Sequence, residues 1–294
     1  MPKVLPFKQV DVFAEELYKG NPVAVINCMG IDESEVTTEQ LQGIANWTNL
    51  SETTFLFKPT DAGCDYKVRI FTPGSELPFA GHPTVGSCKA FLEFSGIKKE
   101  TVVQQCGLGH IKLSVTSDQK ISFKAGATII DEVTDENITA YEATMDVKTI
   151  ERPKLLRVGP NWLVCLVKDS EEVLKVEADL AAMEALDKVN GHTGIILGGL
   201  KKGCTTGDEY EIRAFAPIEG VPEDPVCGSG TLSFIRYLQE INQFKESKTL
   251  HITQGARLGR NGNLYCKIDF LPEGKVDYYV GGYSTTIIDG TITL

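Results

Sequence analysis

The sequence predicts an α+β fold of two similar halves, each a curved mixed β-sheet wrapped around a central helix. One observation is an internal repeat, in which VRIFTPGSELPFAGHPTVG at 68–86 is matched by EIRAFAPIEGVPEDPVCGSGT at 211–231. A second is that short alternating apolar runs outnumber helical patterns, so few strands are joined by helices. A third is that each copy of the repeat runs into a segment apolar on nearly all sides, as a helix enclosed by a sheet must be.

The strands are predicted from runs in which β-branched and aromatic residues alternate with polar ones. The first half contains six such runs, at 8–13, 22–27, 53–57, 66–71, 110–115 and 120–125. The second half contains eight, at 155–159, 162–167, 193–199, 210–215, 249–253, 263–270, 277–282 and 284–289. This arrangement favours mixed sheets over a doubly wound parallel sheet.

Two central helices are predicted, one from each copy of the repeat. In the first, Pro83 suits a first helical position and residues 84–94 are apolar or small on nearly every face. The second, at 230–240, has the same composition. Two surface helices complete the prediction, each opened by a side chain that can cap it: 37–47, with a threonine cap, and 179–188, with Asp179.

The length of 294 residues favours two domains, or one large one. The polar, acidic segment 131–154 is expected near their junction, and the boundary is placed between 115 and 152. We predict an N-terminal domain at 1–118, joined by the C-terminal strand 283–294, and a C-terminal domain at 119–282.

Composition narrows the class of partner. The net charge of −11, without any basic run, argues against nucleic acid or an anionic membrane as the partner. No apolar stretch is long enough to span a bilayer and no signal peptide is recognisable, so a cytoplasmic location is expected. The eight cysteines form no C-x-x-C pair, which predicts neither a disulfide framework nor a metal site. No dinucleotide or phosphate-binding glycine motif occurs, so an oxidoreductase is disfavoured.

Both copies of the repeat place small or polar residues at the start of a central helix, where backbone N–H groups lack partners inside the helix. Gly81 and His82 stand at the first helix, and Gly228 and Ser229 at the second. Two such ends facing each other across a cleft would bind a small carboxylate. The alternative is a pair of helix caps with glycine for tight packing.

Two carboxylates are candidates for proton transfer. Glu52 stands at the entrance of an apolar strand, where partial burial would raise its pKa toward that of a general base. Asp224 lies in the acidic turn before the second helix and could contact substrate. The alternatives are an exposed strand-end charge for Glu52 and a turn former for Asp224.

Five segments together resemble the phenazine-biosynthesis PhzF-like isomerases, which are related in fold to diaminopimelate epimerase and proline racemase. In order along the chain they are GNPVAVI at 20–26, NLSETTFL at 49–56, FAGHPT at 79–84, EDPVCGSGT at 223–231 and VGGYSTTIIDGTITL at 280–294. The resemblance covers the whole chain. It implies two sheet-around-helix halves with one active site between them.

The resemblance also implies roles for the candidate residues. Glu52 would be the acid/base that moves a proton between carbons, without metal, flavin, nicotinamide or pyridoxal phosphate. His82, Asp224 and Ser229 match the family's other polar site positions. The backbone of Gly81 and Gly228 would approach the substrate carboxylate.

In the epimerase relatives two cysteines at the helix mouths act as opposed bases. Here the matching positions are Ala80 and Cys227, so a racemisation by two thiols is excluded by residue type. A one-base reaction by Glu52 is the simplest mechanism left. Cys227 is either a second acid/base or a small residue packed beside the turn.

We therefore predict a cofactor-independent isomerase or epimerase of a small carboxylic acid. The alternative is a ligand-sensing or regulatory binding protein on an enzyme-derived scaffold. The sheets are expected to leave edges that need covering, which a homodimer would provide.

Overall fold

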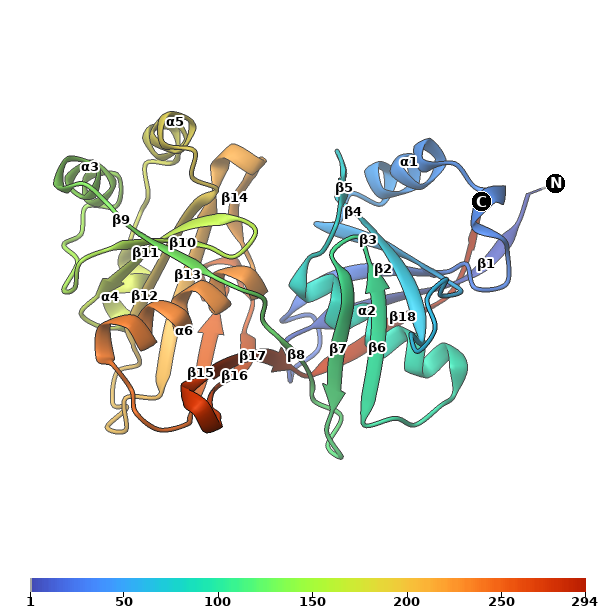
Figure 1. The fold of residues 1–294 in the computed structure, drawn as a ribbon. Helices are drawn as coiled ribbons and strands as arrows, with labels where there is room; N and C mark the ends of the chain where they lie inside the picture. The colour runs from blue at the N-terminus through green and yellow to red at the C-terminus, as the bar shows by residue number, and fades with distance from the viewer. Residues whose placement is uncertain (1) are drawn as a thin grey trace. The chain divides into compact units, whose positions relative to one another are not determined.

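The structure is a computed structural model that describes residues 2–294, and its contacts divide the chain into two compact units (Figure 1). Unit 1 comprises residues 1–124 with 281–294, and unit 2 comprises 125–280. The chain therefore passes between the units twice. The sequence-based boundary at 118/119 differs because β8 (Ile121–Lys124) pairs with β7 (Gly109–Val115) and so belongs to unit 1.

Unit 1 is a mixed sheet with strand order β18–β1–β2–β3–β4–β6–β7–β8. The pairs β2/β3 and β4/β6 are parallel, and the others are antiparallel. Its remaining elements are β1 (Val4–Val12), β2 (Asn21–Asn27), η1 (Glu33–Glu35), α1 (Thr38–Thr48), β3 (Glu52–Phe57), β4 (Tyr66–Phe71), β5 (Glu76–Leu77), α2 (Gly81–Ser95), β6 (Thr101–Cys106) and β18 (Ser284–Thr293).

Unit 2 has the strand order β9–β10–β11–β12–β13–β15–β16, with β11/β12 and β13/β15 parallel. Its elements are β9 (Ile129–Glu132), α3 (Asp135–Met145), β10 (Lys154–Arg157), β11 (Asn161–Val167), α4 (Ser170–Lys175), α5 (Leu180–Asn190), β12 (Gly194–Leu200), β13 (Glu209–Ala216), η2 (Pro217–Glu219), β14 (Val221–Asp224), α6 (Gly228–Asn242), β15 (Lys248–Gln254), η3 (Ala256–Leu258), β16 (Gly262–Phe270), η4 (Pro272–Gly274) and β17 (Val276–Gly282).

The two units repeat one pattern, which confirms the predicted α+β fold of two similar halves. A parallel pair joined through one or two helices (β2/β3, β11/β12) is followed by an antiparallel partner (β4, β13). That strand then pairs in parallel with the strand after the central helix (β6, β15). Residue equivalences between the units follow from these registers.

The central helices lie close to their sheets, as the repeat predicts. In unit 1, α2 contacts strands from both ends of the sheet order, β18 and β8, as well as β1 to β4. Close approach requires glycine in both helices: a Cβ at Gly86 would lie 2.4 Å from Val23 Cγ1, and one at Gly230 would lie 2.4 Å from Ile196 Cδ1. In unit 2, α6 contacts β10, β11, β12 and β16, so each central helix packs against strands across its own sheet.

The predicted surface helices are present and are capped as expected. Thr37 accepts a hydrogen bond from the Gln40 N–H at the start of α1, and Asp179 accepts one from the Ala182 N–H at the start of α5. These local signals work because the capping side chain and its partner are only three residues apart.

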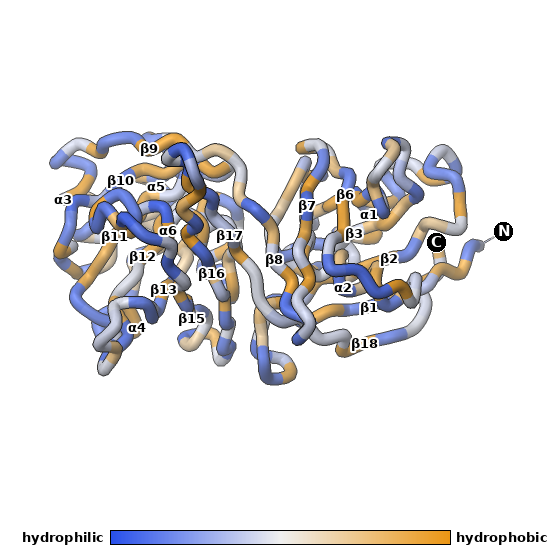
Figure 2. Tube along the Cα trace, turned by 60° about the horizontal axis from the view of Figure 1, so that its bottom comes forward, coloured by the Kyte–Doolittle hydropathy of each residue, from blue (hydrophilic) through white to orange (hydrophobic). Residues whose placement is uncertain are grey.

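The segment 131–154 lies wholly in unit 2, where it forms parts of β9 and β10 with the helix α3 between them. The sequence analysis missed α3 because two of its four buried residues are polar, Glu142 and Thr144. Figure 2 shows hydrophilic residues, in blue, over much of this helix. Also missed were α4, β5, β6, β9 and β14, which are short or lack clear alternation.

Within residues 2–294 no helix is long and apolar enough to cross a membrane.

Candidate active site in two half-sites

The first half-site, in unit 1, brings together Glu52 and His82. Glu52 is the first residue of β3 and pairs in register with Val23 of β2. His82 is the second residue of α2, directly after Gly81. The His82 Nδ1 atom lies 3.2 Å from Glu52 Oε2, and the two side chains are only 6% and 15% exposed. The sequence-predicted base and the helix-mouth histidine are therefore direct neighbours.

The local backbone conformation places the side chains of Glu52 and His82. Asn49 ends α1 in the left-handed region, at φ 53°, and turns the chain into β3. Ala80 is extended, so α2 begins abruptly at Gly81 with no side-chain cap. The Ser87 hydroxyl of α2 donates to Thr54 Oγ1 of β3 at 2.9 Å, which ties the helix to the strand that carries Glu52.

Burial sets the protonation state of the histidine. It lowers the pKa of His82 to about 3, although a hydrogen bond to the Pro22 backbone acts in the opposite direction. The imidazole is therefore neutral near pH 7 and carries one N–H. Because the ring is neutral, its approach to Glu52 at 3.2 Å is a close contact and not an ion pair, and the ring also hydrogen-bonds the Pro22 backbone.

The second half-site, in unit 2, gathers Asp224, Cys227 and Ser229 around the start of α6. Cys227 caps the helix, with its Sγ accepting the Gly230 N–H at 3.2 Å. The Ser229 hydroxyl lies 3.4 Å from that sulfur. Asp224 ends β14, and its Oδ1 accepts the Val226 N–H at 2.9 Å. Gly228 is the first helical residue, so its N–H lies in the first turn.

Burial raises the pKa of Asp224 to about 6, and the charge of neighbouring Glu223 acts in the same direction. Hydrogen bonds from the Val226 backbone and the Cys227 side chain partly oppose this rise. A carboxyl with this pKa exchanges its proton within the physiological range, which is the property a general acid or base needs.

The two half-sites are equivalent in position but not in chemistry. By strand register the counterpart of Glu52 is Gly194, where a Cβ would lie 1.9 Å from the Phe215 carbonyl oxygen. No side chain fits there, so unit 2 cannot hold a second glutamate. His82 corresponds to Ser229 of CGSG, and the serine receives a hydrogen bond from Trp162 Nε1 at 3.1 Å instead of a carboxylate.

Trp162 and Gln254 belong to the second half-site and were missed from the sequence. Gln254 hydrogen-bonds the backbone of both Asp224 and Cys227. Trp162 lies in an apolar strand that gave no polar signal. The repeat offered a signal for Gln254. The dipeptide Gln254-Gly255 ends an alternating strand and is matched by Cys106-Gly107 in the first half, so it could have been recognised as a second repeated turn.

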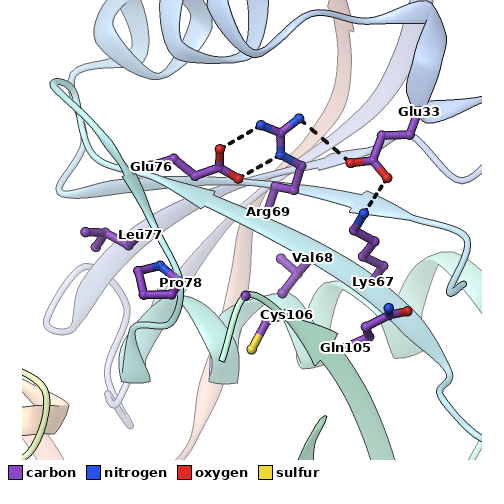
Figure 3. Close-up of a pocket in the computed structure, with 10 residues that line it drawn as sticks. Glu33, Lys67, Val68, Arg69, Glu76, Leu77, Pro78, Gln105 and Cys106 are labelled. Atoms are coloured by element: carbon purple, nitrogen blue, oxygen red, sulfur yellow. Dashed lines mark hydrogen bonds and ion pairs between the residues drawn. The ribbon is translucent and has the colours of Figure 1, made fainter. Parts of the chain in front are cut away.

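A pocket of about 410 Å³ lies elsewhere in unit 1 (Figure 3). There the Arg69 guanidinium is held between the carboxylates of Glu76 and Glu33, and Lys67 also contacts Glu33. None of the predicted site residues lines it. Among the described residues no three His, Cys, Asp or Glu side chains converge as metal ligands.

Comparison with known proteins places this geometry in context. The family model described as phenazine biosynthesis-like protein, PhzC–PhzF, matches residues 10–290. A Schizosaccharomyces pombe protein named antisense-enhancing sequence 1 is 35% identical, over 97% of this chain and 97% of its own. The trans-2,3-dihydro-3-hydroxyanthranilate isomerase of Pseudomonas chlororaphis is 27% identical, over 97% of this chain and 98% of its own.

Solved structures agree with the family match. The crystal structure of a PhzF-family phenazine biosynthesis protein from Enterococcus faecalis superposes with a TM-score of 0.81 at 27% identity, covering 99% of this chain and 100% of that one. A hydroxyproline epimerase from Agrobacterium vitis superposes with a TM-score of 0.62 over 99% of this chain and 93% of that one. Its 12% identity shows a shared fold alone.

Proposed function

Because the chain belongs to the phenazine biosynthesis-like (PhzC–PhzF) family and is an enzyme of the isomerase class, we propose that it moves a proton between carbons of a small carboxylic acid, with Glu52 as general acid and base. The observation that carries this proposal is the contact between Glu52 Oε2 and His82 Nδ1, 3.2 Å apart in a largely buried site. Burial disfavours the charged form of a carboxylate and so makes it a stronger base than an exposed one. A stronger base is better able to remove a proton from carbon.

The proposed reaction is balanced without an oxidant or reductant. Glu52 takes a proton from a carbon next to the substrate's carboxylate or double bond, and the electron pair of that C–H bond moves into the adjacent π system. The protonated Glu52 then returns the proton to another carbon, or to the same one. His82, neutral near pH 7, would hold the carboxyl in place through its ring nitrogen.

The second half-site would bind and polarise the substrate. The N–H groups at the start of α6, from Gly228 onward, can bind a carboxylate, and the corresponding groups at Gly81 can do the same in unit 1. Asp224 and Ser229 would donate hydrogen bonds to the substrate's polar substituents, with Asp224 exchanging a proton as needed. Cys227 is the remaining candidate for a second acid/base, because the position matching it in unit 1 is Ala80.

The proposed substrate class is a small cyclic or amino-acid-like carboxylic acid. The name of the Pseudomonas chlororaphis relative, trans-2,3-dihydro-3-hydroxyanthranilate isomerase, contains a compound of this class. We also propose that the reaction uses neither a metal nor an organic cofactor, because each half-site offers proton donors and acceptors suited to carbon-acid chemistry. A cytoplasmic homodimer is part of the proposal, and light scattering tests its dimeric state.

The test is proton exchange in heavy water, followed by NMR, with a panel of small amino, imino and cyclic unsaturated acids. Deuterium should enter a carbon position of at least one compound with the wild-type protein and with Glu39→Gln, an exposed glutamate of α1 that serves as control. Exchange that proceeds equally with Glu52→Gln would remove Glu52 from the mechanism.

A double-mutant cycle tests whether both half-sites act on one substrate molecule. If they do, Glu52→Gln and Asp224→Asn together should slow turnover by much less than the product of their separate effects, since residues that act as a unit are non-additive. Effects that multiply would show that the two carboxyls act independently.

A ligand-sensing role is the second candidate, favoured by one observation. The Schizosaccharomyces pombe relative, 35% identical along its length, carries a name that states no reaction. Compounds of the panel that raise the unfolding temperature but never exchange a proton would favour this role.

A further inference from the structure

Gln254, at the end of β15, holds both ends of the loop that carries Asp224. Its Oε1 accepts the Cys227 N–H at 2.9 Å, and its Nε2 donates to the Asp224 carbonyl oxygen at 2.7 Å. The side chain is 1% exposed. One buried amide therefore fixes the last residue of β14 and the N-cap of α6, with only Pro225 and Val226 between them.

The backbone around Gln254 is fitted to this contact. The next residue, Gly255, has φ 95°, and a Cβ there would lie 2.5 Å from the Pro225 carbonyl oxygen. Only glycine allows the end of β15 to approach the loop so closely. Pro225 lacks an N–H, and the Val226 N–H is donated to the Asp224 side chain.

Unit 1 provides an internal control for what the fold alone requires. There the close approach is kept, because a Cβ at Gly107 would lie 2.8 Å from Pro78 Cα. The register of β6 against β4 and of β15 against β13 makes Cys106 the counterpart of Gln254. The repeat makes Leu77 the counterpart of Asp224.

Figure 3 shows Leu77 and Cys106 at the lining of the pocket of about 410 Å³; the cysteine side chain carries no amide, and the loop instead accepts the Leu108 backbone N–H at the Pro78 carbonyl oxygen, 3.1 Å away. Unit 1 thus forms the same sheet, turn and central helix without a glutamine. The bridge formed by the Gln254 amide therefore occurs in the unit that holds Asp224, and the fold itself does not require it.

We propose that Gln254 is a positioning residue for the second half-site: by holding the backbone of Asp224 and Cys227, its amide sets where the Asp224 carboxyl and the first turn of α6 meet the substrate. This inference rests on the proposed function, in which both groups contact substrate. Both of these hydrogen bonds of the Gln254 amide go to protein backbone, so it would act through Asp224 and not on the reacting atoms.

The test compares two substitutions with a matched control. Gln254→Met removes both hydrogen bonds with little change in size, and Gln254→Glu keeps the acceptor for Cys227 while losing the donor to Asp224. Cys106→Met places the same side chain at the equivalent position of unit 1. Steady-state kinetics are measured on a compound that exchanges protons, together with the titration of the Asp224 carboxyl by carbon-13 NMR, assigned by its loss in Asp224→Asn.

We expect kcat to fall about 10- to 100-fold in both Gln254 variants, with KM changed by less than about threefold, because misplacement by an ångström is costly in the transition state. The titration midpoint of Asp224 should move in Gln254→Met, which adds no charge, since the Asp224 carboxyl would shift relative to Glu223 and Cys227, the groups that face it. Cys106→Met should leave kcat and the midpoint unchanged.

A folded Gln254→Met protein with wild-type kcat and an unchanged Asp224 titration would overturn the inference. If Gln254→Met does not fold, Gln254→Glu decides by kcat at unchanged KM, and wild-type kcat in that variant would likewise overturn the inference. The titration also separates this inference from the proposed function: if the wild-type protein exchanges no proton on any compound, a displaced midpoint still supports positioning by Gln254, and an unmoved one refutes it.

Discussion

Replacing Asp224 with asparagine should stabilise unit 2 above about pH 6, although Asp224 is a proposed site residue. Its pKa is raised by burial from the ordinary value of 3.8 to about 6. The folded protein therefore binds this proton more tightly than the unfolded chain does, so stability falls as pH rises between these two values and then levels off.

The size of the effect follows from the shift in the pKa. A change from 3.8 to about 6 corresponds to about 3 kcal/mol, since each tenfold change in proton affinity is worth about 1.4 kcal/mol. The side chain keeps partial contact with solvent, so this is an upper value. Asparagine resembles the protonated carboxyl and can still accept the Val226 N–H. We expect a gain of about 1–3 kcal/mol at pH 7.5 and almost none near pH 4.

The chain supplies its own probe for this measurement. It has two tryptophans, Trp47 in unit 1, which is 81% exposed, and Trp162 in unit 2, which is 3% exposed. In a Trp47→Phe background, urea unfolding followed by Trp162 fluorescence reports on unit 2 from pH 4 to 8. Glu246→Gln, an exposed carboxylate in the loop after α6, is the control. Lower stability of Asp224→Asn at pH 7.5, or an unchanged pH slope between 4 and 6.5, would refute the reasoning.

Three further predictions concern packing, charge and metal. Gly230→Ala should cost about 1–3 kcal/mol of unfolding free energy, because its Cβ would overlap Ile196. Gly43→Ala, in open space on α1, should instead stabilise the protein by a few tenths to about 1 kcal/mol. Thermal unfolding of both variants checks this, and equal effects would contradict it. Glu223→Gln breaks the buried ion pair with Arg213 and should lower the unfolding free energy by about 3–5 kcal/mol in urea titrations. Glu76→Gln, in the equivalent but more exposed pair with Arg69, should cost about 0–1 kcal/mol. A reversed order would show that burial is not the deciding factor. Overnight dialysis against a strong chelator should leave the exchange rate unchanged, and a loss of rate restored by one added metal would overturn the proposed metal-free chemistry.

Features set by neighbours in the chain could be predicted from the sequence. The caps of α1 and α5, the alternating strands and the two central helices depend on residues a few positions apart, and all are present. The repeat also predicted that two helix starts would carry matching small-residue turns. α3 escaped because its buried face is partly polar, so periodicity alone gives a weak signal.

Features set by residues far apart in the chain could not be predicted in the same way. The pairing of Glu52 with His82 joins positions 30 residues apart. The strand and repeat patterns made each residue a candidate separately, but the role of Glu52 as the acid/base came from the family resemblance. Gln254 and Trp162 reach their partners across 27 and 67 residues, through strand registers that no local pattern encodes. In unit 2 the position equivalent to Glu52 is Gly194, and only the close backbone contact there explains why it carries no glutamate.

The most direct measurement takes the compound that exchanges fastest and compares two quantities in the wild type and in Glu52→Gln: the rate of deuterium incorporation and the dissociation constant from calorimetry. If Glu52 is the base, the rate should fall at least about a hundredfold, in line with the 10²–10⁴ typical of general base catalysis, while the dissociation constant stays within about threefold. Incorporation at the wild-type rate in a variant that still binds would contradict the central claim that Glu52 moves the proton.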